Sequence, residues 1–316
     1  MRMRTVDFHV TPPQTPGTSW RLSAQLHLPA GAPPDTVQLL LPGLTYDRRY
    51  WSAPGALDYT RHAVGEGYAV LALDRPGTGA SEHPPAEQVT VDSNVEAVHQ
   101  VIDVLRRGAP GIPAFRHVVA VGHSLGSGIA LIEAARHQDL DALVVTGLLH
   151  AFGPLYAEAL PALYPAAQDE LLAPTAPPEN YLTTLPGRRA ALYEHPPGMD
   201  PELSEYHEHT KSTVTAGEGM TLESIYDPAV AAGVRVPVLL VMGRCDRLFG
   251  GGDVTIDDAA SVLQYERKFY TGTTDLDAFV VPEAAHSLNV HRTAPSWYTA
   301  AHQWLGGRVP ARTPRP

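Results

Sequence analysis

One stretch, residues 118–131, constrains the fold of this chain more than any other. It begins with an apolar run of strand type that ends at Val121, and a helix-forming run starts near Leu125. Between them lies the pattern Gly-x-Ser-x-Gly, centred on Ser124. A turn this tight strains the backbone of the serine, and side chains at the two glycine positions would clash. The stretch therefore predicts an exposed serine hydroxyl at a helix N-terminus, where the helix dipole favours negative charge.

The pentapeptide, with a strand before it and a helix after it, resembles the nucleophile turn of the α/β-hydrolase family. The resemblance covers about residues 20–305, and the middle of the chain is the least similar part. It implies an α/β fold: an eight-stranded, mostly parallel sheet flanked by helices, with a triad in the order Ser, acid, His. Taken alone, the pentapeptide could also be a chance glycine-rich turn, so the partners of Ser124 decide between the two interpretations.

Two residues are the predicted partners of Ser124. His286 follows the short apolar strand 278–281, at the place where the resemblance puts the general base. Asp246 follows the apolar strand 236–242 and is the carboxylate of a tight loop, which makes it the predicted acid. All three residues follow predicted strands, and open α/β sheets bind ligands at the carboxyl ends of their strands. The weaker rivals are His291 as base and, as acids, Asp253, Asp275 and Asp277.

Two backbone N–H groups are predicted to form an oxyanion hole. The N–H of Leu125 points to the same place as the serine hydroxyl in a turn of this kind. The second donor is assigned by resemblance: the family often has His-Gly-x after its first parallel strand, and the residue after the glycine donates. Here Pro42 replaces the histidine, and Leu44 is the matching residue. A plain Pro-Gly turn that ends the strand is the alternative.

Alternating strand-type and helix-type runs over 1–150 and 231–309 predict the α/β core. An antiparallel hairpin is expected over 3–10 and 20–28. Asp74 begins a glycine-rich turn and is expected to anchor loop N–H groups rather than act in catalysis. The further predicted strands are 37–41, 68–73, 117–121, 142–146, 236–242 and 278–281, and the predicted helices are 59–66, 91–107, 257–269 and 296–305.

Residues 151–230 break this alternation and are rich in Pro, Tyr, Glu and His. Their position matches the place where family members insert a cap, so we expect a mainly helical or irregular cap with short helices in 155–172 and 201–211. Residues 310–316 are expected to form a flexible tail. Aromatic side chains of the cap either line a substrate pocket or pack within the cap itself; the candidates are Phe152, Tyr156, Tyr164, Tyr181, Tyr193 and Tyr206.

Composition excludes several classes of function. The net charge of −11 disfavours nucleic acid and anionic membranes as partners. Cys245 is the single cysteine, so no intrachain disulfide can form, and no run of 18 apolar residues could span a membrane. The first residues lack the apolar segment of a secretory signal, so we expect a cytoplasmic protein. The 15 histidines show no metal-ligand spacing, and neither a metal nor a cofactor is expected.

These residues predict a serine hydrolase that cleaves a carboxylic ester, lactone or thioester of a small apolar molecule through an acyl-enzyme on Ser124. An acyltransferase or cyclase of a biosynthetic pathway could use the same triad and exclude water. A non-catalytic ligand-binding homologue is the third hypothesis, and a lyase or cofactor-free oxygen chemistry is also compatible with these residues. The sequence does not distinguish a monomer from a homodimer.

Overall fold

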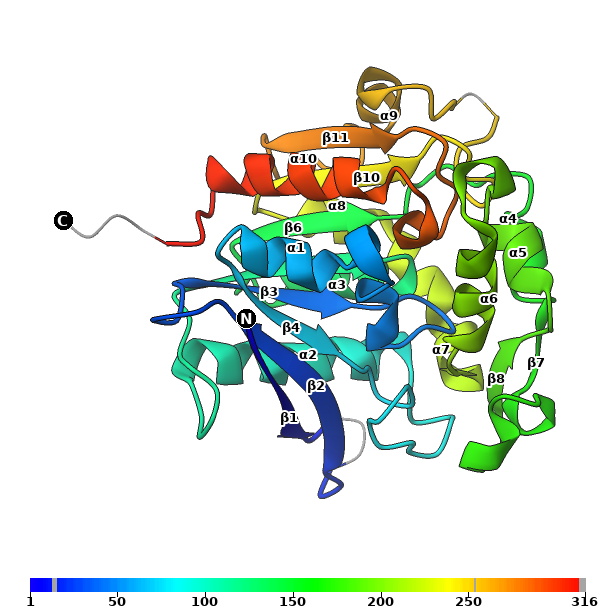
Figure 1. The fold of residues 1–316 in the computed structure, drawn as a ribbon, viewed down its shortest axis with the longest axis horizontal. Coiled ribbons are helices and arrows are strands. Elements are labelled where there is room, and N and C mark those ends of the chain that lie inside the picture. The colour runs from blue at the N-terminus through cyan, green and yellow to red at the C-terminus, as the bar shows by residue number, and fades with distance from the viewer. Residues whose placement is uncertain (13–15, 253, 313–316) are drawn as a thin grey trace.

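The computed structural model describes residues 1–12, 16–252 and 254–312. An eight-stranded sheet runs through the molecule in the order β1-β2-β4-β3-β5-β6-β10-β11 (Figure 1). Strand β2 is antiparallel to both of its neighbours, and all other neighbouring strands are parallel, as predicted. The strands are β1 (Arg2–Val10), β2 (Trp20–Leu28), β3 (Thr36–Leu41), β4 (Ala69–Leu73), β5 (His117–His123), β6 (Ala142–Thr146), β10 (Val238–Gly243) and β11 (Leu276–Val281).

Helices cover both faces of this sheet (Figure 1). On one face α1 packs against α10, and on the other α2, α3 and α8 pack together. Helix α9 packs against β11 at the edge of the sheet. The bounds are α1 (Tyr59–Gly65), α2 (Val91–Arg107), α3 (Leu125–Arg136), α8 (Pro228–Gly233), α9 (Ala259–Glu266) and α10 (Ala294–Gly306).

The order of the strands places the candidate site. Strand β3 pairs with β4 on one side and with β5 on the other, so the direction in which the chain winds reverses between β3 and β5. In open parallel sheets, ligands bind beyond the carboxyl ends of the strands at such a switch point. The loop after β3 contains Leu44, and the turn after β5 contains Ser124. Both residues therefore lie next to the switch point between these two strands.

Residues 151–230 lie between β6 and β10, beyond the ends toward which the β3 and β4 arrows point (Figure 1). The prediction of a mainly helical or irregular segment misses a three-stranded antiparallel sheet, because its strands have only two to four residues and show no clear alternation. The strands and α-helices of this segment, apart from α8, are α4 (Tyr156–Ala159), β7 (Leu163–Pro165), β8 (Tyr181–Thr184), α5 (Arg188–Tyr193), α6 (Pro201–His209), β9 (Val214–Thr215) and α7 (Ala216–Thr221).

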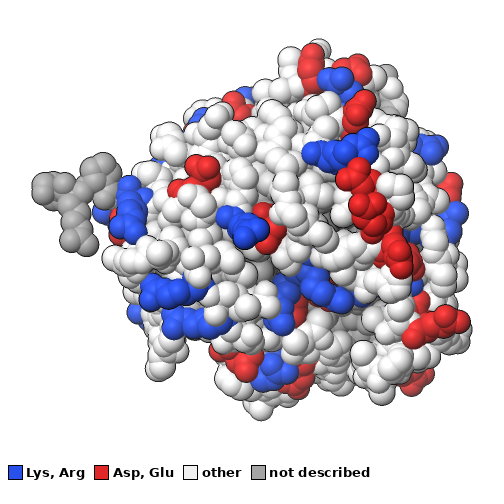
Figure 2. Space-filling model, viewed as in Figure 1, with Lys and Arg blue, Asp and Glu red and all other residues white. Residues whose placement is uncertain are grey.

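The surface shows two further features. Of the predicted tail, residues 310–312 hydrogen-bond to residues 32–36, for example through Ala311 O and Asp35 N at 3.0 Å, and residues 313–316 lie outside the described part. Figure 2 shows basic and acidic side chains together on one face, with neither sign covering it. Within the described ranges, no helix has the length and apolar character needed to cross a bilayer.

Candidate active site

Ser124 occupies the strained turn that the sequence predicts. Its backbone angles are φ 51° and ψ −118°, outside the regions that L-residues prefer, at a cost of about 1–3 kcal/mol. The glycines on either side are required because a Cβ at Gly122 would lie 2.5 Å from Ser127 Cα. A Cβ at Gly126 would lie 2.2 Å from Leu41 O, so the loop after β3 can approach the start of α3 only because this residue is glycine.

His286 and Asp246 come together as the sequence predicts. Nδ1 of His286 lies 3.0 Å from Oδ2 of Asp246, and both side chains are buried. The other carboxylate oxygen, Oδ1, accepts hydrogen bonds from the N–H groups of Leu248 at 2.8 Å and Phe249 at 3.2 Å. These two N–H groups hold the carboxylate in place. Because an ionised carboxylate only accepts, Nδ1 of His286 carries the proton and Nε2 is free to act as a base.

The rings around His286 orient it toward the pocket. Tyr193, Phe249 and His123 contact it, with ring centroids 5.5, 5.7 and 4.9 Å away. Ser124 and His286 line the same pocket, but within the described residues no hydrogen bond joins their side chains. Catalytic hydrogen bonds are often long in free enzymes and shorten when substrate binds. The structure thus brings the three predicted residues to one site.

Leu44 and Leu125 lie on either side of Ser124. A Cβ at Gly43 would lie 3.1 Å from Ser124 Cβ, which shows how closely the loop after β3 approaches the serine. Leu125 is the first residue of α3, so its N–H has no carbonyl partner within the helix. In the described part of the chain the N–H of Leu44 donates to no backbone carbonyl. Both residues line the pocket, as two oxyanion donors would.

The pocket beside Ser124 is lined mainly by apolar side chains. It encloses about 760 Å³ between atoms, including the part open to solvent. Among the described residues that line it, none is Asp, Glu, Lys or Arg. Sequence reasoning missed Tyr46 and Phe249, although each lies two or three residues from a predicted site residue. The lining side chains, besides those already placed, are Leu148, Tyr156, Ala157, Ala159, Leu160, Tyr193, Leu222, Ile225, Tyr226 and Leu248.

Two of the six predicted aromatic candidates, Tyr156 and Tyr193, line this pocket. Phe152 lies behind Tyr156, with a centroid distance of 4.1 Å, and is 44% exposed. The other three do not line the pocket, and their hydroxyl groups donate elsewhere. Tyr164 bonds to Asp169 at 2.6 Å, Tyr181 to Pro84 O at 2.7 Å and Tyr206 to Arg49 O at 3.0 Å.

A second Ser-His-acid arrangement lies behind the pocket and is buried. Ser287 Oγ is 3.1 Å from His207 Nε2, and His207 Nδ1 is 2.7 Å from Glu194 Oε1. Ser287 and His207 are at most 1% exposed, so no substrate reaches this hydroxyl. The Tyr46 hydroxyl contacts both residues, and burial raises its pKa far above the usual range. We therefore interpret this network as a support for the loop that carries His286.

The rival residues have structural partners. His291 is buried, its Nδ1 lies 2.9 Å from Ser287 O, and its Nε2 accepts from His195 N at 3.0 Å and Ala285 N at 3.2 Å. It therefore has no free nitrogen to act as a base. Asp275 and Asp277 both pair with Arg308, and Asp253 lies outside the described residues.

Because His291 is buried, we expect the free energy of unfolding to fall in acid. Burial lowers its pKa to about 4, so the folded protein holds it neutral whereas the unfolded chain protonates it near pH 6.5. Its contribution is complete above pH 6.5 and is lost as the pH falls toward 4, a change of about 3 kcal/mol. We expect the free energy of unfolding, measured with urea, to differ less between pH 7 and pH 4 for His291→Gln than for wild type. The matched control is His9→Gln at an exposed site, and its free energy of unfolding should change between the two pH values as much as that of wild type. The same change in all three proteins would contradict the prediction.

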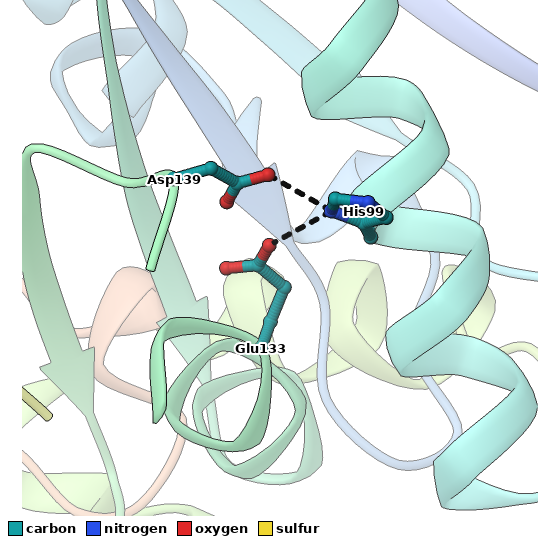
Figure 3. A group of neighbouring side chains, drawn as sticks. All are labelled: His99, Glu133 and Asp139. Carbon is teal, nitrogen blue, oxygen red and sulfur yellow. Dashed lines mark hydrogen bonds and ion pairs between the residues drawn. The ribbon is translucent and has the colours of Figure 1, made fainter. Parts of the chain in front are cut away.

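One further cluster contains potential metal ligands that sequence spacing did not reveal. Figure 3 shows His99 of α2, Glu133 of α3 and Asp139 close together. His99 Nδ1 lies 2.8 Å from Asp139 Oδ2 and 3.7 Å from Glu133 Oε1. Burial, followed by the nearby Asp139, raises the pKa of Glu133 to about 10, so this carboxyl group keeps a proton at neutral pH. None of these three residues lines the pocket beside Ser124, and we assign no function to the cluster.

Comparison with known proteins agrees with the fold described above. The model of the alpha/beta hydrolase family matches residues 38–300. The chain belongs to this family. No curated protein matches the sequence.

Several solved structures of low sequence identity share the fold of this α/β-hydrolase chain. An esterase from Thermogutta terrifontis is 17% identical with a TM-score of 0.63, over 96% of this chain and 98% of that one. A monoacylglycerol lipase from Paleococcus ferrophilus is 17% identical with a TM-score of 0.60, over 98% and 100%. An enol-lactonase from Burkholderia xenovorans is 16% identical with a TM-score of 0.58, over 90% and 96%.

Proposed function

We propose that this α/β-hydrolase is a serine hydrolase that cleaves a carboxylic ester, lactone or thioester of a small apolar molecule. The observation that carries the proposal is the composition of one apolar pocket. Ser124, His286 and the two candidate oxyanion donors, Leu44 and Leu125, all line it, and His286 is hydrogen-bonded to the buried Asp246. A nucleophile, a base oriented by an acid, and two N–H donors are the parts that acyl transfer requires.

In the proposed mechanism, His286 Nε2 takes the proton of the Ser124 hydroxyl as its oxygen attacks the carbonyl carbon of the substrate. The N–H groups of Leu44 and Leu125 stabilise the oxyanion, and His286 passes its proton to the leaving group. Water then attacks the acyl-enzyme, with His286 again as base, and frees Ser124. Asp246 keeps the proton on Nδ1 and stabilises the charged imidazolium.

The pocket favours a neutral, apolar substrate. None of the described residues that line it is Asp, Glu, Lys or Arg, and burial raises the pKa of the four lining tyrosines, so these tyrosines stay neutral. A charged group placed there would lose its hydration and gain no partner. Eight of the sixteen lining residues come from 151–230, which supports the proposal that this segment is a cap. The relatives named above include an esterase, a lipase and a lactonase, which fits cleavage of ester-type bonds.

A substrate panel tests the proposal. We expect the protein to hydrolyse p-nitrophenyl hexanoate, and to act on the ester of the matching ω-carboxylic acid with a kcat/KM lower by about 100-fold or more, because the carboxylate would be buried unpaired. Reactions with and without an added alcohol separate hydrolysis from acyl transfer, since a transferase would form the new ester. Absence of turnover for esters, lactones and thioesters, together with no labelling by a fluorophosphonate, would favour the non-catalytic ligand-binding hypothesis.

A further inference from the structure

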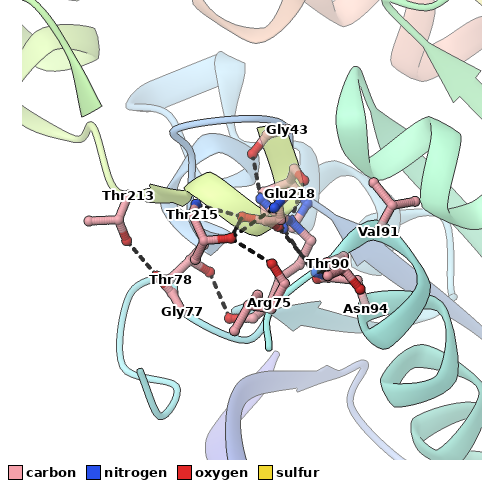
Figure 4. A network of polar contacts seen from close by, with 12 residues as sticks. Gly43, Arg75, Gly77, Thr78, Thr90, Val91, Asn94, Thr213, Thr215 and Glu218 are labelled. Atoms are coloured by element: carbon pink, nitrogen blue, oxygen red, sulfur yellow. Dashed lines mark hydrogen bonds and ion pairs between the residues drawn. The ribbon is translucent and has the colours of Figure 1, made fainter. Parts of the chain in front are cut away.

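Arg75, which the mechanism above does not use, is fully buried beside the oxyanion loop. It belongs to the glycine-rich turn after β4. Its Nε donates to Pro42 O at 3.0 Å. Its Nη2 donates to Gly43 O at 3.0 Å, and Figure 4 shows these two residues. A buried guanidinium group is costly unless its donors are satisfied. Two of the guanidinium donors are satisfied by the carbonyl groups of consecutive residues, Pro42 and Gly43, in the loop that contains Leu44.

The bond to Gly43 O has a consequence for Leu44. In a trans peptide the C=O of one residue and the N–H of the next point in opposite directions. Holding Gly43 O toward Arg75 therefore turns the N–H of Leu44 the other way. Leu44 lines the pocket next to Ser124, and a Cβ at Gly43 would lie 3.1 Å from Ser124 Cβ. Gly43 O also accepts from Tyr46 N at 3.3 Å, so the guanidinium group and this turn together set the direction of one candidate oxyanion donor.

The partner of Arg75 comes from the inserted segment 151–230. Glu218, in the first turn of α7, forms an ion pair with Arg75 Nη1, and both side chains are fully buried. Glu218 is itself held, because its Oε2 accepts from Thr215 N at 3.0 Å and its Oε1 from Asn94 Nδ2 at 3.1 Å. Asn94 Oδ1 also accepts from Arg75 at 3.2 Å. The ion pair links residues 143 positions apart and joins the insertion to the oxyanion loop.

We propose that Arg75 is a positioning residue for the oxyanion hole, held in place by Glu218 of the inserted segment. The proposal rests on the proposed serine hydrolase function. Glu218 balances the charge of Arg75, so the guanidinium group acts by orienting the Gly43–Leu44 peptide and not as a free cation in the pocket. Because an oxyanion exists in the transition state and not in the bound substrate, loss of this orientation lowers kcat and leaves KM nearly unchanged.

The test compares Arg75→Lys with wild type on p-nitrophenyl hexanoate. Lysine keeps the charge opposite Glu218 but cannot donate to both carbonyl groups in the fixed geometry of a guanidinium group. Active sites are counted with a fluorophosphonate, so kcat refers only to folded protein. We expect kcat per titrated site to fall about 10- to 100-fold, against about 10²–10³-fold for complete loss of one donor. We expect KM to stay within about twofold. Affinity for a trifluoromethyl ketone, which forms an oxyanion on the serine, should fall in parallel with kcat.

Val101→Ala is the matched control, because Val101 is buried in the same helix as Asn94 but has no part in this network. It should lower the melting temperature and leave kcat per titrated site unchanged. If Arg75→Lys does not fold, Glu218→Gln serves instead, with kcat again falling severalfold at constant KM. Values of kcat per site equal to the control would overturn the inference while the hydrolase function stands. A wild-type protein that neither reacts with the fluorophosphonate nor hydrolyses any ester would overturn both.

Discussion

Replacing Ser124 with alanine is expected to lower kcat/KM for ester hydrolysis by about 10⁴- to 10⁶-fold, because the variant has no nucleophile to form the acyl-enzyme. Residual activity would come from the oxyanion donors and from binding in the pocket. The fold should persist, because within the described residues the Ser124 hydroxyl makes no hydrogen bond. Alanine also adopts the strained backbone angles at about the same cost as serine.

Steady-state kinetics and labelling with a fluorophosphonate check this expectation together. The alanine variant should show no labelling, a circular dichroism spectrum like that of wild type and an unchanged melting temperature. Ser127→Ala is the control: Ser127 lies in the first turn of α3, three residues after Ser124, and its hydroxyl donates to Thr146 O at 2.9 Å. That variant should still be labelled. Hydrolysis at the wild-type rate by Ser124→Ala would rule out the covalent mechanism.

Asp246→Asn is expected to reduce kcat by about 10⁴-fold with little effect on the fold. The amide oxygen can still accept the N–H groups of Leu248 and Phe249, which now bind Oδ1. Its NH₂ group then faces Nδ1 of His286, which must accept that hydrogen bond. The proton of the neutral ring moves to Nε2, and Nε2 can no longer take the proton of Ser124. The loss comes from the wrong tautomer and from the missing negative charge.

Kinetics over a range of pH values, with active sites titrated by the fluorophosphonate, measure the effect of this substitution. Asp275→Asn is the matched control, because Asp275 was a rival acid and its carboxylate pairs with Arg308 away from the pocket. This second variant should keep wild-type kinetics. A large loss in Asp275→Asn, or near-normal activity in Asp246→Asn, would show that the acid has been assigned to the wrong residue.

Local patterns determined a large part of this protein from the sequence. The run of apolar residues into Gly-x-Ser-x-Gly predicted β5, the turn and α3, and the structure confirms them because the backbone at Ser124 depends on its immediate neighbours. Helix α2 was predicted over 91–107, and the structure has it at Val91–Arg107, followed by Gly108 as C-cap with φ 75°. The strands that precede Asp246 and His286 were predicted from their apolar runs. Strand β10 is buried throughout, whereas β11 lies at the edge of the sheet and buries only its first and last residues.

The insertion was predicted least well, for a physical reason. Its strands have two to four residues, too few to show the alternation that identifies a strand. Tyr164, Tyr181 and Tyr206 were reasonable pocket candidates by composition, but each hydroxyl group has a partner outside the pocket. Which aromatic side chain faces a pocket depends on how the segment packs, and no local pattern records that.

The sequence by itself determined which residues could carry the chemistry, because a serine in a glycine turn and a histidine or aspartate after a buried strand are local features. Only the tertiary structure decided how they are oriented. It put Nδ1 of His286 on the Asp246 carboxylate, and it placed Arg75 between the Gly43 carbonyl and Glu218. Such pairings join residues that lie 32 to 143 positions apart in the sequence. Burial makes these pairings strong, because an environment of low polarity strengthens a hydrogen bond and penalises an unpaired polar group.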